Sequence, residues 1–169
     1  MIKKLILSIL IIFLFTFNAF ADEAIEEKNI ISINPIGLLI NSYNGHYSRL
    51  LNDGKNELYI PFHLGVTTFL PEDEFSIGAK YRYYLDENTQ GVFYGVGFRT
   101  GWRMMPYYGG DLAFFITPTV QIGHRWIFDS QFTIAPTISG GIPLSKGDIY
   151  PDKPGIILWR LGIGLGYMF

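Results

Sequence analysis

The chain has 169 residues, enough for one domain with a sizeable core or lumen, and no cysteine, which excludes disulfides and thiolate metal sites. Charged residues make up 17%, below the roughly 25% of ordinary soluble domains, while aromatic residues also reach 17%. The formal net charge is −2. This weakly acidic balance gives no support for a nucleic-acid partner.

Residues 1–21 predict a secretory signal peptide. Lys3 and Lys4 precede an apolar run, and Ala19-Phe20-Ala21 is typical of a cleavage site, so we expect cleavage after Ala21. The alternative is an uncleaved anchor. Residues 22–29 form a mainly acidic lead-in, and no later stretch approaches the length of a transmembrane helix. The exported chain therefore spans a membrane only if it forms a closed β-barrel.

Residues 30–169 predict an all-β domain, an eight-stranded antiparallel up-and-down transmembrane β-barrel. Alternating segments separated by turn residues are typical of such barrels. We expect strands at about 30–40, 42–50, 57–69, 74–85, 91–103, 111–126, 131–142 and 157–169. With a periplasmic N-terminus, the turns after the second, fourth and sixth strands are periplasmic and the longer loops are extracellular.

Alternate residues within the strands divide into an apolar and a polar series. In the last strand one face is apolar or aromatic from Ile157 to Phe169, whereas the other is mostly glycine. We expect the polar series to face a filled, basic lumen carrying Lys80, Arg82, Arg99, Arg103, Arg125 and Arg160. Glu57 is the one expected inward acid, and Glu74 is expected at a loop edge. A hairpin closed by Asp86 and Gly91 would place Glu74 opposite Arg103.

Four prolines lie inside the expected strands. Pro35, Pro61, Pro118 and Pro136 each remove a donor from the sheet, and a closed barrel has no free edge to hold them. Bulges are the usual solution, but the sequence assigns none to these positions.

The signal peptide, the eight two-faced strands and the terminal run from Leu165 to Phe169 together resemble small eight-stranded outer-membrane proteins of Gram-negative-type bacteria. In that class a C-terminal aromatic, preceded by alternating apolar residues, is read by the barrel-assembly machinery. The resemblance implies this role for Tyr167 and Phe169. It also implies a place in the bacterial outer membrane, but no activity and no subfamily.

Several residues are candidates for chemistry. His46 and Ser48 share one strand face, as in lipid A deacylases, and Asp129-Ser130 has a parallel in membrane acyltransferases, although we expect it to form a turn. His46 and His63 can both face inward, but a third metal ligand is missing. The loop residues Met104, Met105, Tyr107 and Tyr108 are typical of a binding surface. The alternative is that this loop caps the barrel.

The sequence favours an integral outer-membrane protein with a structural or surface-interaction role, since an eight-stranded lumen is too narrow for a general diffusion pore. The alternatives are a lipid-modifying enzyme on the barrel wall and a soluble periplasmic ligand-binding barrel. We expect no catalytic residue, metal or cofactor. The expected partners are outer-membrane lipid, the export and barrel-assembly machineries, and a surface partner of unknown identity, for a monomeric protein.

Overall fold

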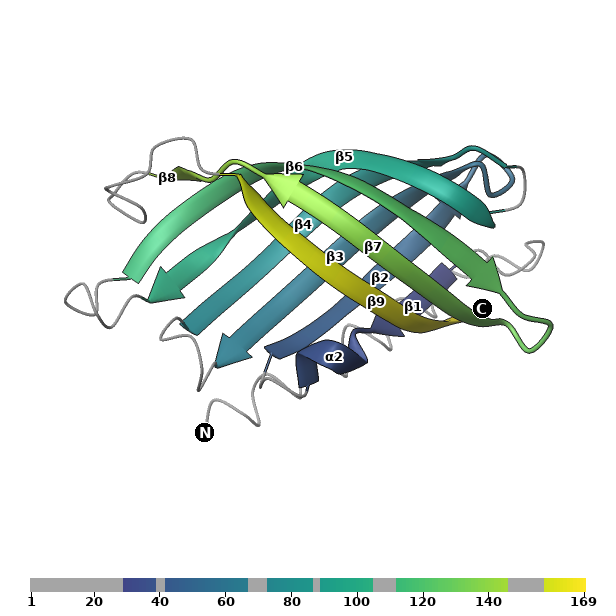
Figure 1. Cartoon of the computed structure of the whole chain (residues 1–169), viewed down its shortest axis with the longest axis horizontal. Coiled ribbons are helices and arrows are strands. Elements are labelled where there is room, and N and C mark those ends of the chain that lie inside the picture. The colour runs from purple at the N-terminus through teal and green to yellow at the C-terminus, as the bar shows by residue number, and fades with distance from the viewer. Residues whose placement is uncertain (1–28, 39–41, 67–72, 87–88, 105–111, 146–156) are drawn as a thin grey trace, which may run out of the picture.

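The computed structural model of the chain describes residues 29–38, 42–66, 73–86, 89–104, 112–145 and 157–169. These residues form a closed antiparallel barrel of eight strands (Figure 1). The elements are β1 (Asn29–Ile33), α2 (Pro35–Leu38), β2 (Ser42–Leu51), β3 (Asn56–Val66), β4 (Asp73–Tyr84), β5 (Gly91–Met104), β6 (Leu112–Ile127), β7 (Phe132–Gly141), β8 (Leu144–Ser145) and β9 (Leu158–Met168). The two-residue β8 follows β7 and pairs with the same neighbour, β6, in the same register. β7 and β8 therefore count as one strand of the wall, which has eight strands. The predicted signal peptide and most of the lead-in lie outside the described residues.

The ring of paired residues defines the shear of the barrel. Leu165 of β9 pairs with Ile134 of β7 and, on its other side, with Ile33 of β1. Going round the wall from Ile33, successive partners are Gly45, Phe62, Ile77, Thr100, Ile116 and Leu144. Leu144 lies ten residues beyond Ile134. In an eight-stranded barrel this displacement tilts the strands by about 40° from the axis.

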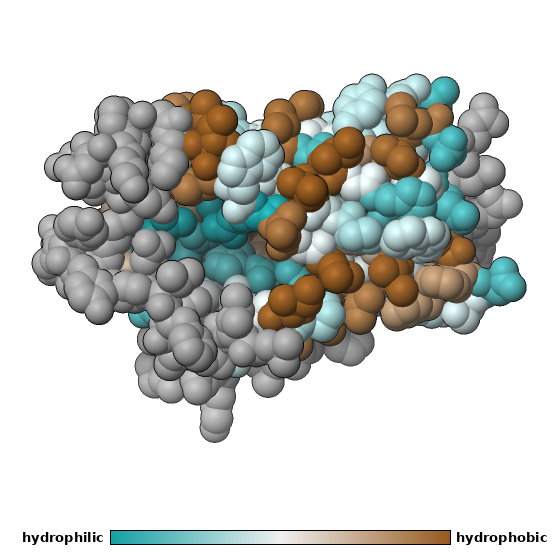
Figure 2. All heavy atoms as spheres, viewed as in Figure 1, coloured by the Kyte–Doolittle hydropathy of each residue, from teal (hydrophilic) through white to brown (hydrophobic). Residues whose placement is uncertain are grey.

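The predicted alternation of faces is confirmed. Along β5, Val92, Tyr94, Val96, Phe98 and Trp102 are exposed outside, while Arg99 and Arg103 are buried. The hairpin register is also confirmed, since Arg82 pairs with Gly95, Lys80 with Gly97, Gly78 with Arg99 and Glu74 with Arg103. Brown, apolar side chains therefore cover much of the outer surface in Figure 2.

The first strand is shorter than predicted. β1 ends at Ile33, where the sequence suggested a strand to residue 40, and Pro35 begins the four-residue helix α2. Asn34 Oδ1 accepts a hydrogen bond from the Ile36 amide at 3.2 Å, as a helix-capping residue does. Proline is favoured in the first helical turn because its missing N–H is not needed there. Pro35 therefore ends the strand and lies outside it.

The other three prolines lie within strands, each at a break in one of its two ladders. Pro61 pairs with β2 but interrupts the β3–β4 ladder. Pro118 of β6 pairs with β5, and on the other side it lies in the gap between the β6–β7 and β6–β8 ladders. Pro136 pairs with β9 but interrupts the β6–β7 ladder. The register is unchanged across every break, so no bulge is needed. Each proline directs its missing donor toward the break.

The two ends of the described barrel are joined by backbone hydrogen bonds. The Asn29 amide donates to the Phe169 carbonyl at 2.8 Å, and the Phe169 amide donates to the Asn29 carbonyl at 2.8 Å. Phe169 therefore contributes to barrel closure through its backbone.

Deletion of Phe169 should lower the free energy of unfolding by about 1–3 kcal/mol, because two backbone hydrogen bonds are lost. Denaturant titration of the folded protein measures this change. Phe169→Ala is the matched control, since it removes a partly exposed ring but keeps both bonds, and should cost less. Equal losses in the two variants would contradict the closing role of the backbone.

Candidate functional site in the barrel interior

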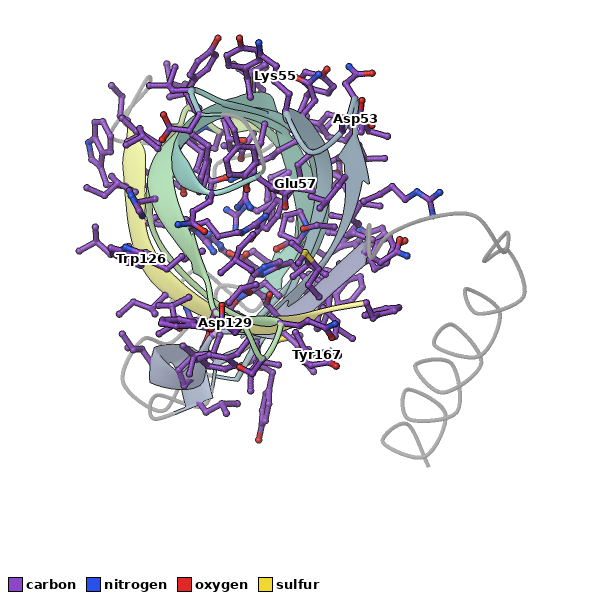
Figure 3. The ribbon with its side chains drawn as sticks, turned by 90° about the vertical axis from the view of Figure 1, so that its right-hand side faces the viewer. Asp53, Lys55, Glu57, Trp126, Asp129 and Tyr167 are labelled. Atoms are coloured by element: carbon purple, nitrogen blue, oxygen red, sulfur yellow. The ribbon has the colours of Figure 1, made fainter. Side chains whose placement is uncertain are left out.

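The first interior cluster is centred on Glu57 of β3, which points into the barrel in Figure 3. Its Oε1 accepts hydrogen bonds from Arg82 at 3.1 Å and Arg125 at 3.0 Å, and its Oε2 accepts one from Tyr84 at 2.5 Å. Glu57 and Arg125 are fully buried and Arg82 is 1% exposed. Three donors thus surround one carboxylate, as a buried charge requires. The cluster joins β3, β4 and β6 across the lumen.

Aromatic rings complete the coordination of Arg82. Its guanidinium carbon lies 3.4 Å from the ring centroid of Tyr59 and 4.5 Å from that of Phe93. Its Nε donates to Gln121 Oε1 at 3.0 Å. Cation–π contacts of this kind stabilise a guanidinium that water cannot reach. Contacts from β3, β5 and β6 therefore hold the Arg82 side chain in one position inside the lumen.

The second cluster is centred on Glu74 of β4 and holds three arginines. Oε2 accepts hydrogen bonds from Arg103 at 2.5 Å and Arg160 at 3.2 Å, and Oε1 accepts one from Arg99. Ser76 adds a hydroxyl donor at 2.9 Å. The expectation that Glu57 is the one inward acid is wrong, because Glu74, at the loop end of β4, also faces the lumen. β4 begins at Asp73, so Glu74 falls in phase with the inward series, and it is only 6% exposed.

All six arginines and lysines expected in the lumen lie on the inner face. Five of them bind one of the two carboxylates. The exception is Lys80, for which no ion pair is found within the described part of the chain. Its ammonium lies 5.9 Å from the Tyr59 ring centroid.

A cavity of about 550 Å³ adjoins the Glu74 cluster and is lined in part by His46, His63 and Lys80. Figure 2 shows hydrophilic side chains in a hollow on this face of the molecule. His63 Nδ1 lies 3.3 Å from the Ser42 hydroxyl, and Nε2 lies 3.8 Å from Glu74. The lumen is thus filled around Glu57 and hollow beside Glu74.

The candidate catalytic pair does not assemble. His46 and Ser48 both face inward, but no hydrogen bond joins them, and the His46 ring packs on Tyr59 with centroids 4.5 Å apart. Asp129 and Ser130 form an exposed turn between β6 and β7. His46 and His63 line one cavity, yet the described residues contain no group of three metal-ligating side chains.

The remaining candidates lie at the ends of the barrel. Met104 is the partly exposed last residue of β5, while Met105, Tyr107 and Tyr108 lie outside the described residues. Tyr167 and Phe169 are exposed on the outer face at the opposite end.

None of the described helices is long and apolar enough to cross a membrane. No family model, no curated protein and no solved structure matches the chain.

Sequence reasoning missed the aromatic partners of the cations. Tyr59, Tyr84, Phe93 and Phe115 all face the lumen, and Arg99 lies 4.9 Å from the Phe115 ring centroid. The available signal was their position in the inward series. Tyr84, Phe93 and Phe115 have the same parity as the cations of their strands, and Tyr59 has the same parity as Glu57. An apolar ring in that series marks a surface on which a guanidinium stacks.

Glu57→Gln should destabilise the barrel by about 3–5 kcal/mol, because Arg82 and Arg125 lose their shared counter-charge while still buried. Denaturant unfolding of the refolded protein measures the loss. Asp53→Asn is the matched control, since it removes an exposed acid from the β2–β3 turn and should change stability by no more than about 0.5 kcal/mol. Similar values for the two variants would contradict the role of Glu57.

Proposed function

We propose that the protein is an integral bacterial outer-membrane β-barrel with a structural or surface-interaction role. The observation that carries this proposal is the inverted distribution of polarity. The outer face exposes large apolar side chains from every full-length strand, whereas the inner face holds the six lumen cations and both buried carboxylates. A surface patch of this extent is unusual for a soluble monomer and suits a lipid environment.

Aromatic side chains form two bands on the outer face. One band includes Phe75, Trp102 and Phe114, whose successive ring centroids lie 6.4 and 5.6 Å apart. Toward the other end, Tyr83 and Tyr94 lie 5.3 Å apart. Tyr94 and Trp102 are eight residues apart, which corresponds to about 26 Å along the strand, or about 20 Å along the axis at a tilt of about 40°. This span is comparable to the apolar band of outer-membrane barrels, which is about 25 Å tall.

The filled interior supports a role other than general diffusion. Glu57 and its partners cross the lumen from β3 to β6 in a fully buried network. An eight-stranded barrel has an interior that side chains fill or that holds one small ligand. The protein therefore acts through its surface or through a bound molecule, and not as an open pore.

Neither alternative function gains support from a specific observation. A lipid-modifying enzyme needs a nucleophile next to its base, and His46 and Ser48 are not joined. A soluble ligand-binding barrel would carry its apolar face inside, opposite to this one. The predicted signal peptide and the terminal residues Tyr167 and Phe169 fit export and barrel assembly as a monomer.

Val120→Arg tests the membrane proposal. Val120 is 58% exposed on β6, midway between Phe114 and Trp126, so the change puts a charge against the lipid core. We expect a loss of about 2–4 kcal/mol in the free energy of unfolding from lipid vesicles.

Val120→Leu is the matched control and should leave stability nearly unchanged. On a soluble barrel the arginine would face water and change stability by no more than about 0.5 kcal/mol. That result, together with a protein that stays folded without detergent, would overturn the proposal.

A further inference from the structure

Among the described residues, the barrel wall has a side opening between β9 and β2. β1 pairs with β9 no further than Ile33, which faces Leu165, and the chain then leaves the sheet at α2. Residues 158–164 of β9 thus have no strand paired on that side within the described residues. The β1–β2 ladder likewise ends at Gly45, and α2 lies beside both strands. In Figure 1 β1 reaches only one end of β9, and Figure 2 shows a hydrophilic hollow on this face of the molecule.

Positive charge gathers behind this opening. The cavity is lined by Lys80, Arg82, Arg99, Arg103 and Arg160 but by one carboxylate, Glu74. Among the described residues the interior holds six cations and two acids, an excess of four positive charges. Such an excess in a partly enclosed space attracts an anion and is stabilised by it.

Two side chains in the cavity have polar groups that a ligand would satisfy. Lys80 is 7% exposed and forms no ion pair with the described acids. His46 is also 7% exposed, and its Nε2 is buried without a hydrogen-bond partner. The His46 ring faces β9, where its Cε1 would lie 2.9 Å from a Cβ atom at Gly164. The absence of a side chain at Gly164 therefore leaves room for the His46 ring, and both residues line the cavity.

Part of the rim of the same cavity is apolar. Phe62, Trp159 and Leu161 line it and are 38%, 68% and 79% exposed on the outer face. A molecule lying in the opening therefore meets cations at one end and apolar side chains at the other. An anionic head group and a hydrocarbon chain fit these two environments together.

We propose that the cavity binds an anionic amphiphile, a single-chain lipid with a phosphate or carboxylate head group. The head group lies near Lys80 and His46, and the chain leaves through the side opening over Leu161 and Trp159. The inference goes beyond the proposed function and does not depend on it, since the site is built from the lumen and the shortened first strand.

Calorimetric titration of the full chain in uncharged maltoside micelles tests the proposal. Three probes separate the contributions: dodecyl phosphate, inorganic phosphate and dodecanol. We expect saturable binding of dodecyl phosphate, with both other probes at least about tenfold weaker. Inorganic phosphate binding as tightly as dodecyl phosphate would contradict a role for the hydrocarbon chain. Dodecanol binding as tightly would contradict a role for the anionic head group. Absence of saturable dodecyl phosphate binding would overturn the whole proposal.

Variants locate the site. Lys80→Met should weaken dodecyl phosphate binding about tenfold, because a charged hydrogen bond is lost, whereas Lys80→Arg should retain most of it. Lys55→Met is the matched control, since Lys55 is an exposed cation in the distant β2–β3 turn. Leu161→Ser should weaken dodecyl phosphate but not inorganic phosphate. Equal effects of Lys80→Met and Lys55→Met would contradict this placement of the head group.

Discussion

The interior depends on two carboxylates, Glu57 and Glu74, that hold arginines from strands far apart in the sequence. Glu57 joins β3 to β4 and β6, and Glu74 joins β4 to β5 and β9. Without these acids the inward cations would be buried against one another and against aromatic rings. Because each carboxylate accepts several hydrogen bonds from different strands, the two clusters fix the barrel cross-section as well as neutralise charge.

The shortened first strand has the opposite effect, since among the described residues it leaves 158–164 of β9 without a paired strand on one side. Asn34 and Pro35 start a helix where the neighbouring strands continue, so β9 extends beyond its partner. The region around Glu57 is therefore filled and enclosed, whereas the hollow beside Glu74 can be reached from outside through the unpaired side of β9. In the proposed outer-membrane setting, this asymmetry gives a closed periplasmic half and an upper half able to receive a molecule from the side.

Much of the barrel could be predicted because side chains alternate between the two faces of a strand, which leaves few possible registers between neighbouring strands. Once Asp86 and Gly91 close a hairpin, every pair between β4 and β5 follows, including Glu74 with Arg103. The same rule places the six cations inside. What escaped prediction depends on contacts across the lumen, such as the ion pair between Arg160 of β9 and Glu74 of β4. The ten-residue shear that brings these two strands together is not visible in any single hairpin. The end of β1 did carry a signal, since Asn34-Pro35 is a typical helix start.

The most direct test of the membrane account uses the native tryptophans. Trp102, Trp126 and Trp159 are all exposed on the outer face, so each should contact lipid in a folded, inserted barrel. The protein is refolded into vesicles that contain lipids brominated along the acyl chain, and its fluorescence is compared with that in unbrominated vesicles. The account predicts strong quenching, greatest for bromine near the head groups. A folded protein whose fluorescence is unaffected by bromine at any depth would contradict it.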